Sequence, residues 1–371
     1  MLLPKWGRIV GDGRSSGYPG TTRRLGADLT TLPGRGRGAT IGHAYGARVR
    51  ALVMGGNRYI GLHLVFELAR QGHEVTIMNS HEATMPDGVR RIHADRRVPG
   101  AIAEALGPHR DEFDVVFDNT AYDVSDLDPM VELFRGNVSQ FFFTSSVAVY
   151  KRSFIQPVTE AHATHRPDDE DPRKAYGVGK VRSESYLLGM EDLNATSLRV
   201  THTIGPKSPL VTREPIFYRR LELERPILIP GDGFPFVHLV HVQDVARLMV
   251  SLVGNERAHG QIYNVAGSEI TSVEGCIRLM ARAVGVEPHI VHVPLDVARR
   301  ARPPLVHWGE AMVGGAIVSI DKALAHLDWS PEFGLEDGYA DSYAWFDREG
   351  RDLFEYDFSG DDAVLEQLVG S

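Results

Sequence analysis

Tyr176 and Lys180 have the residue types and the spacing of an acid–base pair. In the segment Tyr176-Gly-Val-Gly-Lys180 they stand four residues apart, which on a helix places both side chains on one face. A lysine ammonium near a phenol favours the phenolate, so it lowers a pKa that is otherwise about 10. Tyr176 could then exchange a proton with a substrate oxygen near neutral pH. The same spacing also occurs on ordinary solvated helix faces, so the surrounding elements decide its meaning.

Strand and helix patterns alternate along this part of the chain. Apolar runs predict strands at 49–54, 73–78, 88–94, 113–117, 140–144 and 197–201. Helical spacing of apolar residues predicts helices at 60–71, 128–134 and 176–189. Such alternation is typical of a parallel sheet with helices on both faces. The paired Tyr and Lys would then follow the fifth strand and a polar loop.

A glycine-rich turn, GGNRYIG at 55–61, joins the first strand to the first helix. Glycine permits a tight turn and a close approach of the backbone to a ligand, and the helix N-terminus offers free N–H groups. Strand, turn, helix and second strand in this order predict a site for a dinucleotide pyrophosphate and a Rossmann-type doubly wound sheet. The alternative is a turn that only joins two packed elements.

Three regions divide the 371 residues. Residues 1–48 carry eight Lys or Arg against two Asp and show no sustained period, so we expect a disordered or loosely packed basic extension. Residues 49–206 form mainly the nucleotide-binding domain. Residues 207–371, with shorter elements between Pro and Gly, form mainly a smaller C-terminal α/β substrate lobe, and some of its segments return to the sheet.

The stretch VMGGNRYIGLHLVFELARQGHEVTIMN resembles the opening of the NAD-dependent epimerase/dehydratase family, the extended short-chain dehydrogenases/reductases. Gly55 and Gly61 match the outer glycines of the family's Gly-x-x-Gly-x-x-Gly, and Arg58 stands at the middle one. With an arginine at this position, the turn resembles that of an atypical branch of the family, which includes chloroplast stem-loop RNA-binding proteins. Further similar segments lie at 198–206, 241–246, 263–267 and 319–331, so the resemblance covers about residues 50 to 346.

The resemblance implies roles for individual residues. Ser146, in the segment TSSVAVY at 144–150, occupies the catalytic serine position, so the implied catalytic set is Ser146, Tyr176 and Lys180. The implied cofactor-binding residues are Gly55, Gly56, Asn57, Arg58, Tyr59, Ile60, Gly61, Asn79, Ser80, Asp95, Arg96, Asn119, Thr120, Ala121, Thr144, Tyr176, Lys180 and Thr201. The expected substrate-binding residues are Tyr122, Ser146, His202 and Phe236.

The cofactor is NAD or NADP. The family's habit slightly favours NAD. A carboxylate at the end of the second strand would favour NAD as well, but Asn79-Ser80 stand there. Without that negative charge, and with Arg58 near, a 2′-phosphate could also be accommodated, so NADP stays open.

Departures from the family narrow the reaction. Val147-Ala148 follow Ser146 where 4,6-dehydratases have Asp-Glu, which argues against that elimination. His202 and Val237 replace the Asn and Arg that grip the diphosphate of common UDP-sugars, and Tyr122, Phe236 and His238 suggest a polar-aromatic pocket. We expect an epimerase or oxidoreductase acting on a secondary alcohol or ketone of a sugar, nucleotide sugar or related polyol. The alternative is a non-catalytic RNA-binding or regulatory protein on the same fold.

Composition limits the partners. The net charge is −9, and residues after 48 carry −15 of charge, which opposes nucleic-acid binding. No apolar run has the length of a membrane span or a signal peptide, and a single cysteine, Cys276, fits a reducing cytoplasm. The 16 histidines show no ligand spacing, so we predict no metal. The helix 176–188 could pair in a homodimer, as in many members of the family.

Overall fold

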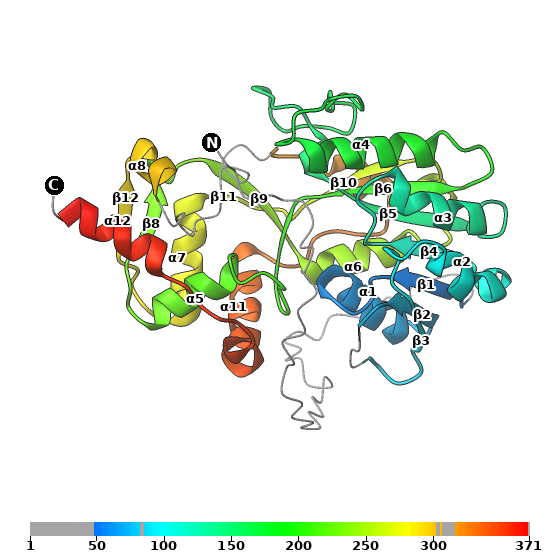
Figure 1. The fold of residues 1–371 in the computed structure, drawn as a ribbon, viewed down its shortest axis with the longest axis horizontal. Coiled ribbons are helices and arrows are strands. Elements are labelled where there is room, and N and C mark those ends of the chain that lie inside the picture. The colour runs from blue at the N-terminus through cyan, green and yellow to red at the C-terminus, as the bar shows by residue number, and fades with distance from the viewer. Residues whose placement is uncertain (1–47, 82–84, 302–304, 306–315, 370–371) are drawn as a thin grey trace. The chain divides into compact units, whose positions relative to one another are not determined.

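Seven parallel strands form the central sheet of the protein (Figure 1). The computed structural model describes residues 48–81, 85–301, 305 and 316–369, so the predicted N-terminal extension lies outside the described residues apart from Arg48. Along the sheet the order is β10-β6-β5-β4-β1-β2-β3. The bounds are β1 Arg50–Met54, β2 Glu74–Asn79, β3 Arg90–His93, β4 Val115–Asp118, β5 Gln140–Ser146, β6 Ala195–Val200 and β10 Ile262–Val265.

The strand order determines where a ligand can bind. The chain builds outward from β1 through β2 and β3 on one side, and through β4, β5 and β6 on the other. The strand order therefore reverses between β1 and β4, and in doubly wound sheets the ligand crevice lies outside the carboxyl ends of the strands at that point. Almost every residue of β1, β4 and β6 is buried, as a sheet covered on both faces requires. The predicted fold class, a Rossmann-type doubly wound parallel sheet, is confirmed.

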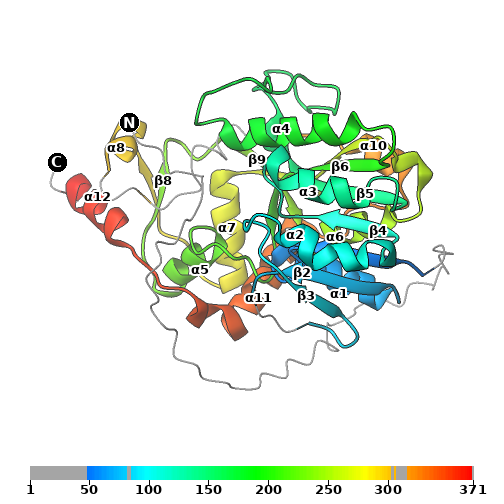
Figure 2. The same ribbon diagram turned by 45° about the vertical axis from the view of Figure 1, so that its right-hand side comes forward.

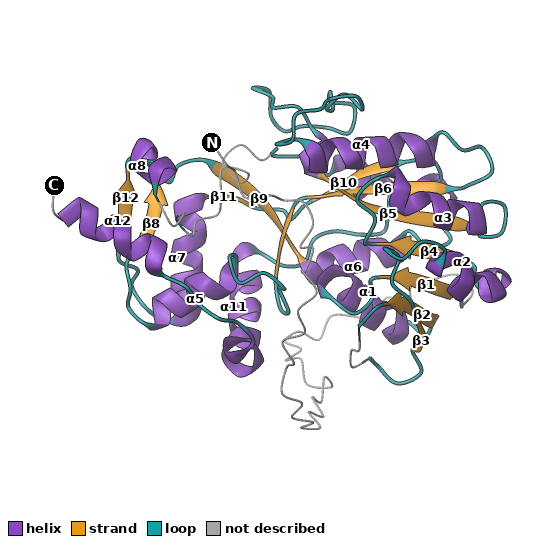
Figure 3. Ribbon diagram, in the orientation of Figure 1, coloured by secondary structure: helices purple, strands orange, loops and turns teal. Residues whose placement is uncertain are grey.

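Helices cover both faces of this sheet (Figures 2 and 3). On one face Leu64 and Leu248 belong to one buried cluster, and on the other Leu127 and Leu187 belong to a second. The helices of the first face are α1 Tyr59–Arg70 and α6 Val242–Ser251, and those of the second are α2 Ala101–Leu106, α3 Val124–Phe134 and α4 Ala175–Leu188. The short α2 was not predicted, and the predicted strand 88–94 is shorter, at Arg90–His93.

The C-terminal half contains two small sheets beside the strand β10 that it contributes to the central one. They are β11-β9-β7, with bounds Ile270–Ser272, Phe236–His241 and His202–Ile204, and β12-β8, with bounds Ile290–Val293 and Ile227–Pro230. The helices are α5 Glu214–Glu222, α7 Val273–Val284, α8 Leu295–Arg300, α10 Asp321–His326, α11 Leu335–Trp345 and α12 Ser359–Val369. Short helical turns lie at Gly107–Glu112, Val147–Val149, Glu256–Ala258, Phe346–Gly350 and Arg351–Leu353.

Aromatic packing and one buried ion pair stabilise this half. Tyr218 and Tyr339 are fully buried, and the Tyr218 hydroxyl donates to the Tyr339 carbonyl at 3.2 Å. Arg220 and Asp361, each 1% exposed, form an ion pair that fixes α12 to α5. None of the described helices is both long and apolar enough to cross a membrane.

Candidate active site

The glycine turn at 55–61 is tight because neither of its ends has room for a side chain. Gly55 adopts a φ of +76°, and a Cβ there would meet Thr120 Cγ2 at 2.2 Å. A Cβ on Gly61 would lie 2.2 Å from the Gly55 carbonyl oxygen. Helix α1 therefore begins directly against the turn, and its unpaired first N–H groups lie where a phosphate can accept from them.

Two side chains of the turn take different directions. The Tyr59 hydroxyl donates to the Thr203 carbonyl at 2.7 Å, and burial raises the pKa of this phenol. The Tyr59 side chain thus anchors the turn to β7, and only its backbone can meet a ligand. Arg58, at the N-cap of α1, is exposed and accessible to a ligand phosphate.

The residues that follow β2 and β3 pair with one another. Asn79 Oδ1 accepts from Arg91 Nε at 2.7 Å, whereas Asn79 Nδ2 is buried without a hydrogen-bond partner among the described residues. The Ser80 hydroxyl bonds the His81 ring at 2.9 Å. The two N–H donors of the Asn79 amide are therefore left unused by the described residues at this edge.

Asp95 and Arg96 do not act together. Hydrogen bonds from Arg97, the shortest at 2.5 Å, lower the pKa of Asp95 to about 2. Arg96 instead turns its guanidinium to the buried carboxylate of Asp118, with contacts of 2.8 and 2.9 Å. The predicted cofactor residue Arg96 is thus a member of a buried ion pair.

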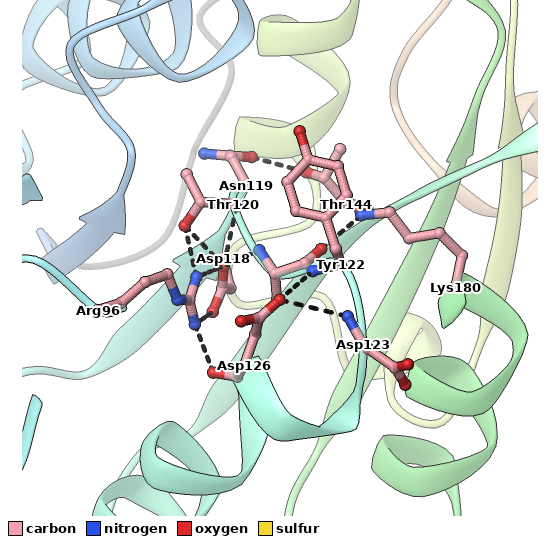
Figure 4. A network of polar contacts seen from close by, with 10 residues as sticks. Arg96, Asp118, Asn119, Thr120, Tyr122, Asp123, Asp126, Thr144 and Lys180 are labelled. Atoms are coloured by element: carbon pink, nitrogen blue, oxygen red, sulfur yellow. Dashed lines mark hydrogen bonds and ion pairs between the residues drawn. The ribbon is translucent and has the colours of Figure 1, made fainter. Parts of the chain in front are cut away.

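Asp118 organises the loop after β4 (Figure 4). Its carboxylate accepts from Arg96 and from the backbone N–H groups of Thr120 and Ala121, both at 3.0 Å. Burial alone would raise the pKa of Asp118, but the Arg96 charge and these donors bring it below its usual value. Arg96 also donates to the Thr120 hydroxyl and, at 2.6 Å, to the Asp126 carbonyl. The Asp118–Arg96 pair therefore holds the loop of predicted cofactor residues 119–121 in place.

The Lys180 ammonium is buried behind the same loop (Figure 4). It donates to the carbonyls of Ala121 and Thr144, both at 2.7 Å, and lies over the rings of Phe143 and Tyr122. Burial lowers the pKa of Lys180 to about 8, against the opposing charge of Asp118. Because an ammonium has three N–H donors, one is left for a ligand hydroxyl.

The Ser146 hydroxyl lies close enough to Tyr176 to act on the pKa of its phenol. Burial raises the pKa of Tyr176, although 38% of the residue is exposed, and the Ser146 hydroxyl and the charge of Arg213 act in the opposite direction. The expectation that Lys180 lowers this pKa is wrong for this arrangement, because two carbonyls hold the ammonium 5.8 Å from the centre of the Tyr176 ring.

Two glycines within the Tyr176–Lys180 segment bring α4 close to both loops. A Cβ on Gly177 would meet the Ala148 carbonyl oxygen at 2.2 Å, and one on Gly179 would meet the Tyr122 carbonyl oxygen at 2.5 Å. The helix backbone therefore lies directly on the loops after β5 and β4. The glycines thus position Tyr176 and Lys180 as much as the helical spacing does.

The segment after β6 adds a polar cluster beside Ser146. Ser146 pairs in register with Val200, so His202 lies just beyond it at the carboxyl edge. The His202 ring accepts from the Arg213 guanidinium, and burial, with the Arg213 charge, lowers the pKa of His202 well below its usual value. Glu214 Oε1 lies 4.0 Å from the same imidazole.

Two of the remaining predicted cofactor residues hydrogen-bond to each other, and a third bonds to the backbone of another strand. Thr144 Oγ1 donates to Asn119 Oδ1 at 2.6 Å, while buried Thr201 donates to the Val265 carbonyl at 3.1 Å. Asn119 Nδ2, like that of Asn79, has no hydrogen-bond partner in the described part of the chain.

Of the expected pocket side chains, one lies clearly beside Tyr176. The Tyr122 ring is 63% exposed and its centre lies 5.9 Å from that of Tyr176. Phe236 packs edge-on against Phe234 at 5.6 Å. His238 is buried with both ring nitrogens bonded to backbone, so it does not line a pocket.

Two residues of the site were not predicted. Asp118 ends an apolar strand, a signal visible in the sequence, whereas Arg213 stands in a polar segment without any local pattern.

Among the residues that the structure describes, no group of three or more His, Cys, Asp or Glu side chains could hold a metal ion.

Comparisons with known proteins agree with this geometry. The family described as NAD dependent epimerase/dehydratase matches residues 51–266. The chain is 30% identical over 341 residues to the chloroplast stem-loop binding protein of 41 kDa b from Arabidopsis thaliana, across 86% of this chain and 85% of the relative.

Two epimerases extend the comparison. The UDP-glucose 4-epimerase of Corynebacterium glutamicum is 27% identical over 352 residues, which span 81% of this chain and 98% of the relative. A solved UDP-glucose-4-epimerase from Stenotrophomonas maltophila with bound NAD has a TM-score of 0.66 at 22% identity, covering 82% of this chain and all of that one. With its glycine turn and strand order, the chain belongs to the NAD dependent epimerase/dehydratase family.

Proposed function

We propose that the protein is an NAD(P)-dependent epimerase or oxidoreductase that acts on a secondary alcohol or ketone of a sugar, nucleotide sugar or related polyol. One observation carries the proposal. Ser146, Tyr176 and the Lys180 ammonium lie together at the carboxyl ends of β4 and β5, and the glycine turn contacts the same β4 loop.

The residues present fit a nicotinamide dinucleotide. The turn from Gly55 to Gly61 has no side chain at either end, so its backbone and the start of helix α1 can approach a pyrophosphate closely. The unpartnered amide donors of Asn79 and Asn119 lie at the ends of β2 and β4, along the crevice. Exposed Arg58 and the neutral Asn79 suit a 2′-phosphate, so NADP remains beside NAD as a cofactor of this site.

The side chains divide the chemistry among them. A bound nicotinamide would supply two-electron transfer with a carbon of the substrate. Tyr176 would give a proton to the substrate oxygen in reduction and take it in oxidation, and Ser146 would orient that oxygen. Lys180 would use its remaining N–H on a ligand hydroxyl while it fixes the loops that carry Ala121 and Thr144.

Epimerisation and net oxidation share this first step. If the oxidised substrate is reduced again on its other face before leaving, the product is an epimer. If the reduced cofactor leaves, the reaction is a dehydrogenation. The relatives named UDP-glucose 4-epimerase favour a nucleotide sugar and the epimerase outcome.

The test is turnover of a panel of nucleotide sugars and keto sugars by wild type and by Tyr176→Phe. We expect the variant to lose about 10²–10⁴ in rate while it binds cofactor normally. The matched control is Tyr186→Phe on the same helix, whose hydroxyl bonds Asp128 at the surface. Full activity in Tyr176→Phe would contradict the proposal. The cytoplasmic location and the homodimer expected from the sequence stay predictions.

A second candidate function is RNA binding, because a relative named for stem-loop binding matches 86% of the chain. The net charge of −9 opposes it, since phosphate-backbone affinity needs clustered Lys and Arg. A gel shift with structured RNA tests it. Salt-sensitive binding that disappears when residues 1–48 are deleted would support this function.

A further inference from the structure

Arg213 has a position in the site that no catalytic role accounts for. It precedes α5 and contacts His202, which follows the strand paired with Ser146. Its charge acts on the Tyr176 phenol, so the guanidinium lies within electrostatic reach of the proposed reacting centre. Arg213 therefore borders the space where a substrate would meet Ser146 and Tyr176.

The partner of this guanidinium is a neutral ring. Because the pKa of His202 lies well below its usual value, the imidazole accepts from Arg213 as an uncharged base. Among the described residues Arg213 forms no ion pair within 4.0 Å. An arginine fork with one neutral partner retains N–H donors for a planar anion.

The buried carboxyl of Glu214 lies next to Arg213 in the chain but forms no ion pair with it within 4.0 Å. It accepts from the Ser208 hydroxyl at 3.0 Å, while its other oxygen makes no hydrogen bond within the described residues. Burial raises the pKa of Glu214, which favours the uncharged acid. Within the cluster of His202, Arg213 and Glu214, the guanidinium is the group that stays positively charged at every working pH, so the ligand group that it favours is an anion.

We propose that Arg213 binds a carboxylate of the substrate, carried on a carbon near the one that reacts, so that the enzyme acts on an acidic sugar rather than a neutral one. This inference rests on the proposed function, since it places the sugar at Ser146 and Tyr176. A planar carboxylate can accept two parallel N–H bonds from a guanidinium, whereas a hydroxymethyl group offers no charge to pair.

The experiment is a binding titration of the full chain, loaded with the dinucleotide that it binds, against matched ligands. The first pair is UDP-glucuronic acid and UDP-glucose. The second pair is D-glucuronate and D-glucose 6-phosphate. We expect the carboxylate member of the nucleotide-sugar pair to bind about tenfold to a hundredfold more tightly. In Arg213→Met that preference should disappear, because the affinity for UDP-glucuronic acid falls to that for UDP-glucose.

Two further variants keep the test decisive. Arg219→Met removes an arginine of the same helix that pairs with Glu222 at 3.1 Å, and it should keep the preference. Arg213→Lys keeps the charge but not the fork, so it should keep only part of the preference even if Arg213→Met fails to fold.

Each other outcome overturns the inference. Equal binding of the acidic and neutral members, or no binding of the acidic ones, shows that Arg213 does not select a carboxylate. Tighter binding of the 6-phosphate than of D-glucuronate would assign the site to a phosphate instead. Dinucleotide binding, measured separately, and turnover of a neutral sugar do not depend on a carboxylate at Arg213. If the carboxylate preference is absent but these two activities are present, the further inference fails and the proposed function stands.

Discussion

The Lys180 ammonium lies 5.8 Å from the centre of the Tyr176 ring and directs two hydrogen bonds away from it, to the Ala121 and Thr144 carbonyls. The lysine therefore joins the loops after β4 and β5 before it acts on any ligand. Within this arrangement the proton affinity of Tyr176 depends on burial, on Ser146 and on Arg213. A substitution of Lys180 should consequently affect the packing of both loops as well as the chemistry.

Lys180→Met should destabilise the protein as well as inactivate it. The substitution removes the donor shared by two carbonyls, and an unsatisfied buried acceptor costs about 1–3 kcal/mol. Urea unfolding measures the loss. Lys174→Met, which breaks a surface pair with Asp169, is the control and should leave the free energy of unfolding nearly unchanged. Equal stability of the two variants would contradict the bridging role of Lys180.

Gly61→Ala should abolish dinucleotide binding, because the new methyl would lie 2.2 Å from the Gly55 carbonyl oxygen and push the turn apart. A fluorescence titration measures the dissociation constant. Gly107→Ala is the matched control, since its Cβ would meet nothing within 4 Å, and it should bind as the wild type does. Unchanged affinity in Gly61→Ala would show that the ligand does not use this turn.

Asp118→Asn should destabilise the protein by about 3–5 kcal/mol at neutral pH, because it leaves the buried Arg96 charge uncompensated. The pKa of Asp118 is lower in the folded protein, so its contribution is present above the unfolded pKa of about 4 and is lost as the pH falls through the folded value. Unfolding of wild type and variant should therefore converge at acidic pH. Asp111→Asn, at an exposed position, should follow the wild type throughout.

Arg213→Met should shift the pH dependence of turnover. The Arg213 charge lowers the pKa of Tyr176, so its removal raises that pKa. Oxidation needs the Tyr176 phenolate, so the rate of oxidation increases as the pH rises through this pKa. In the variant this increase in rate should occur at higher pH. Arg213→Lys, which retains the charge, should keep the wild-type profile. Identical profiles for wild type and Arg213→Met would contradict the electrostatic contact with Tyr176.

The sequence predicted the parts that depend on local pattern. The strands β1 and β5, the glycine turn and the helix that carries Tyr176 follow from apolar runs and spacing within short segments. The partner of Arg96 could not be predicted in this way, because Asp118 comes from β4 and Arg96 from the loop after β3, which are not neighbours in the sheet. The contact of Arg213 with His202 depends likewise on the path of the chain between β7 and α5, for which no residue pattern gives a signal.

The pKa of Tyr176 shows a second limit. Spacing placed Lys180 and Tyr176 on one face of α4, but the two carbonyls that hold the ammonium belong to other loops. The direction of the pKa shift followed from those loops and from burial rather than from the helix.

The most direct test of the central claim is a titration of the full-length protein with NAD, NADH, NADP and NADPH, with Gly61→Ala beside it. The account predicts saturable binding of at least one oxidised and reduced pair by the wild type and loss of that binding in the variant. No binding of any of the four by the folded wild type would contradict a dinucleotide-dependent enzyme and would leave RNA binding as the function to pursue.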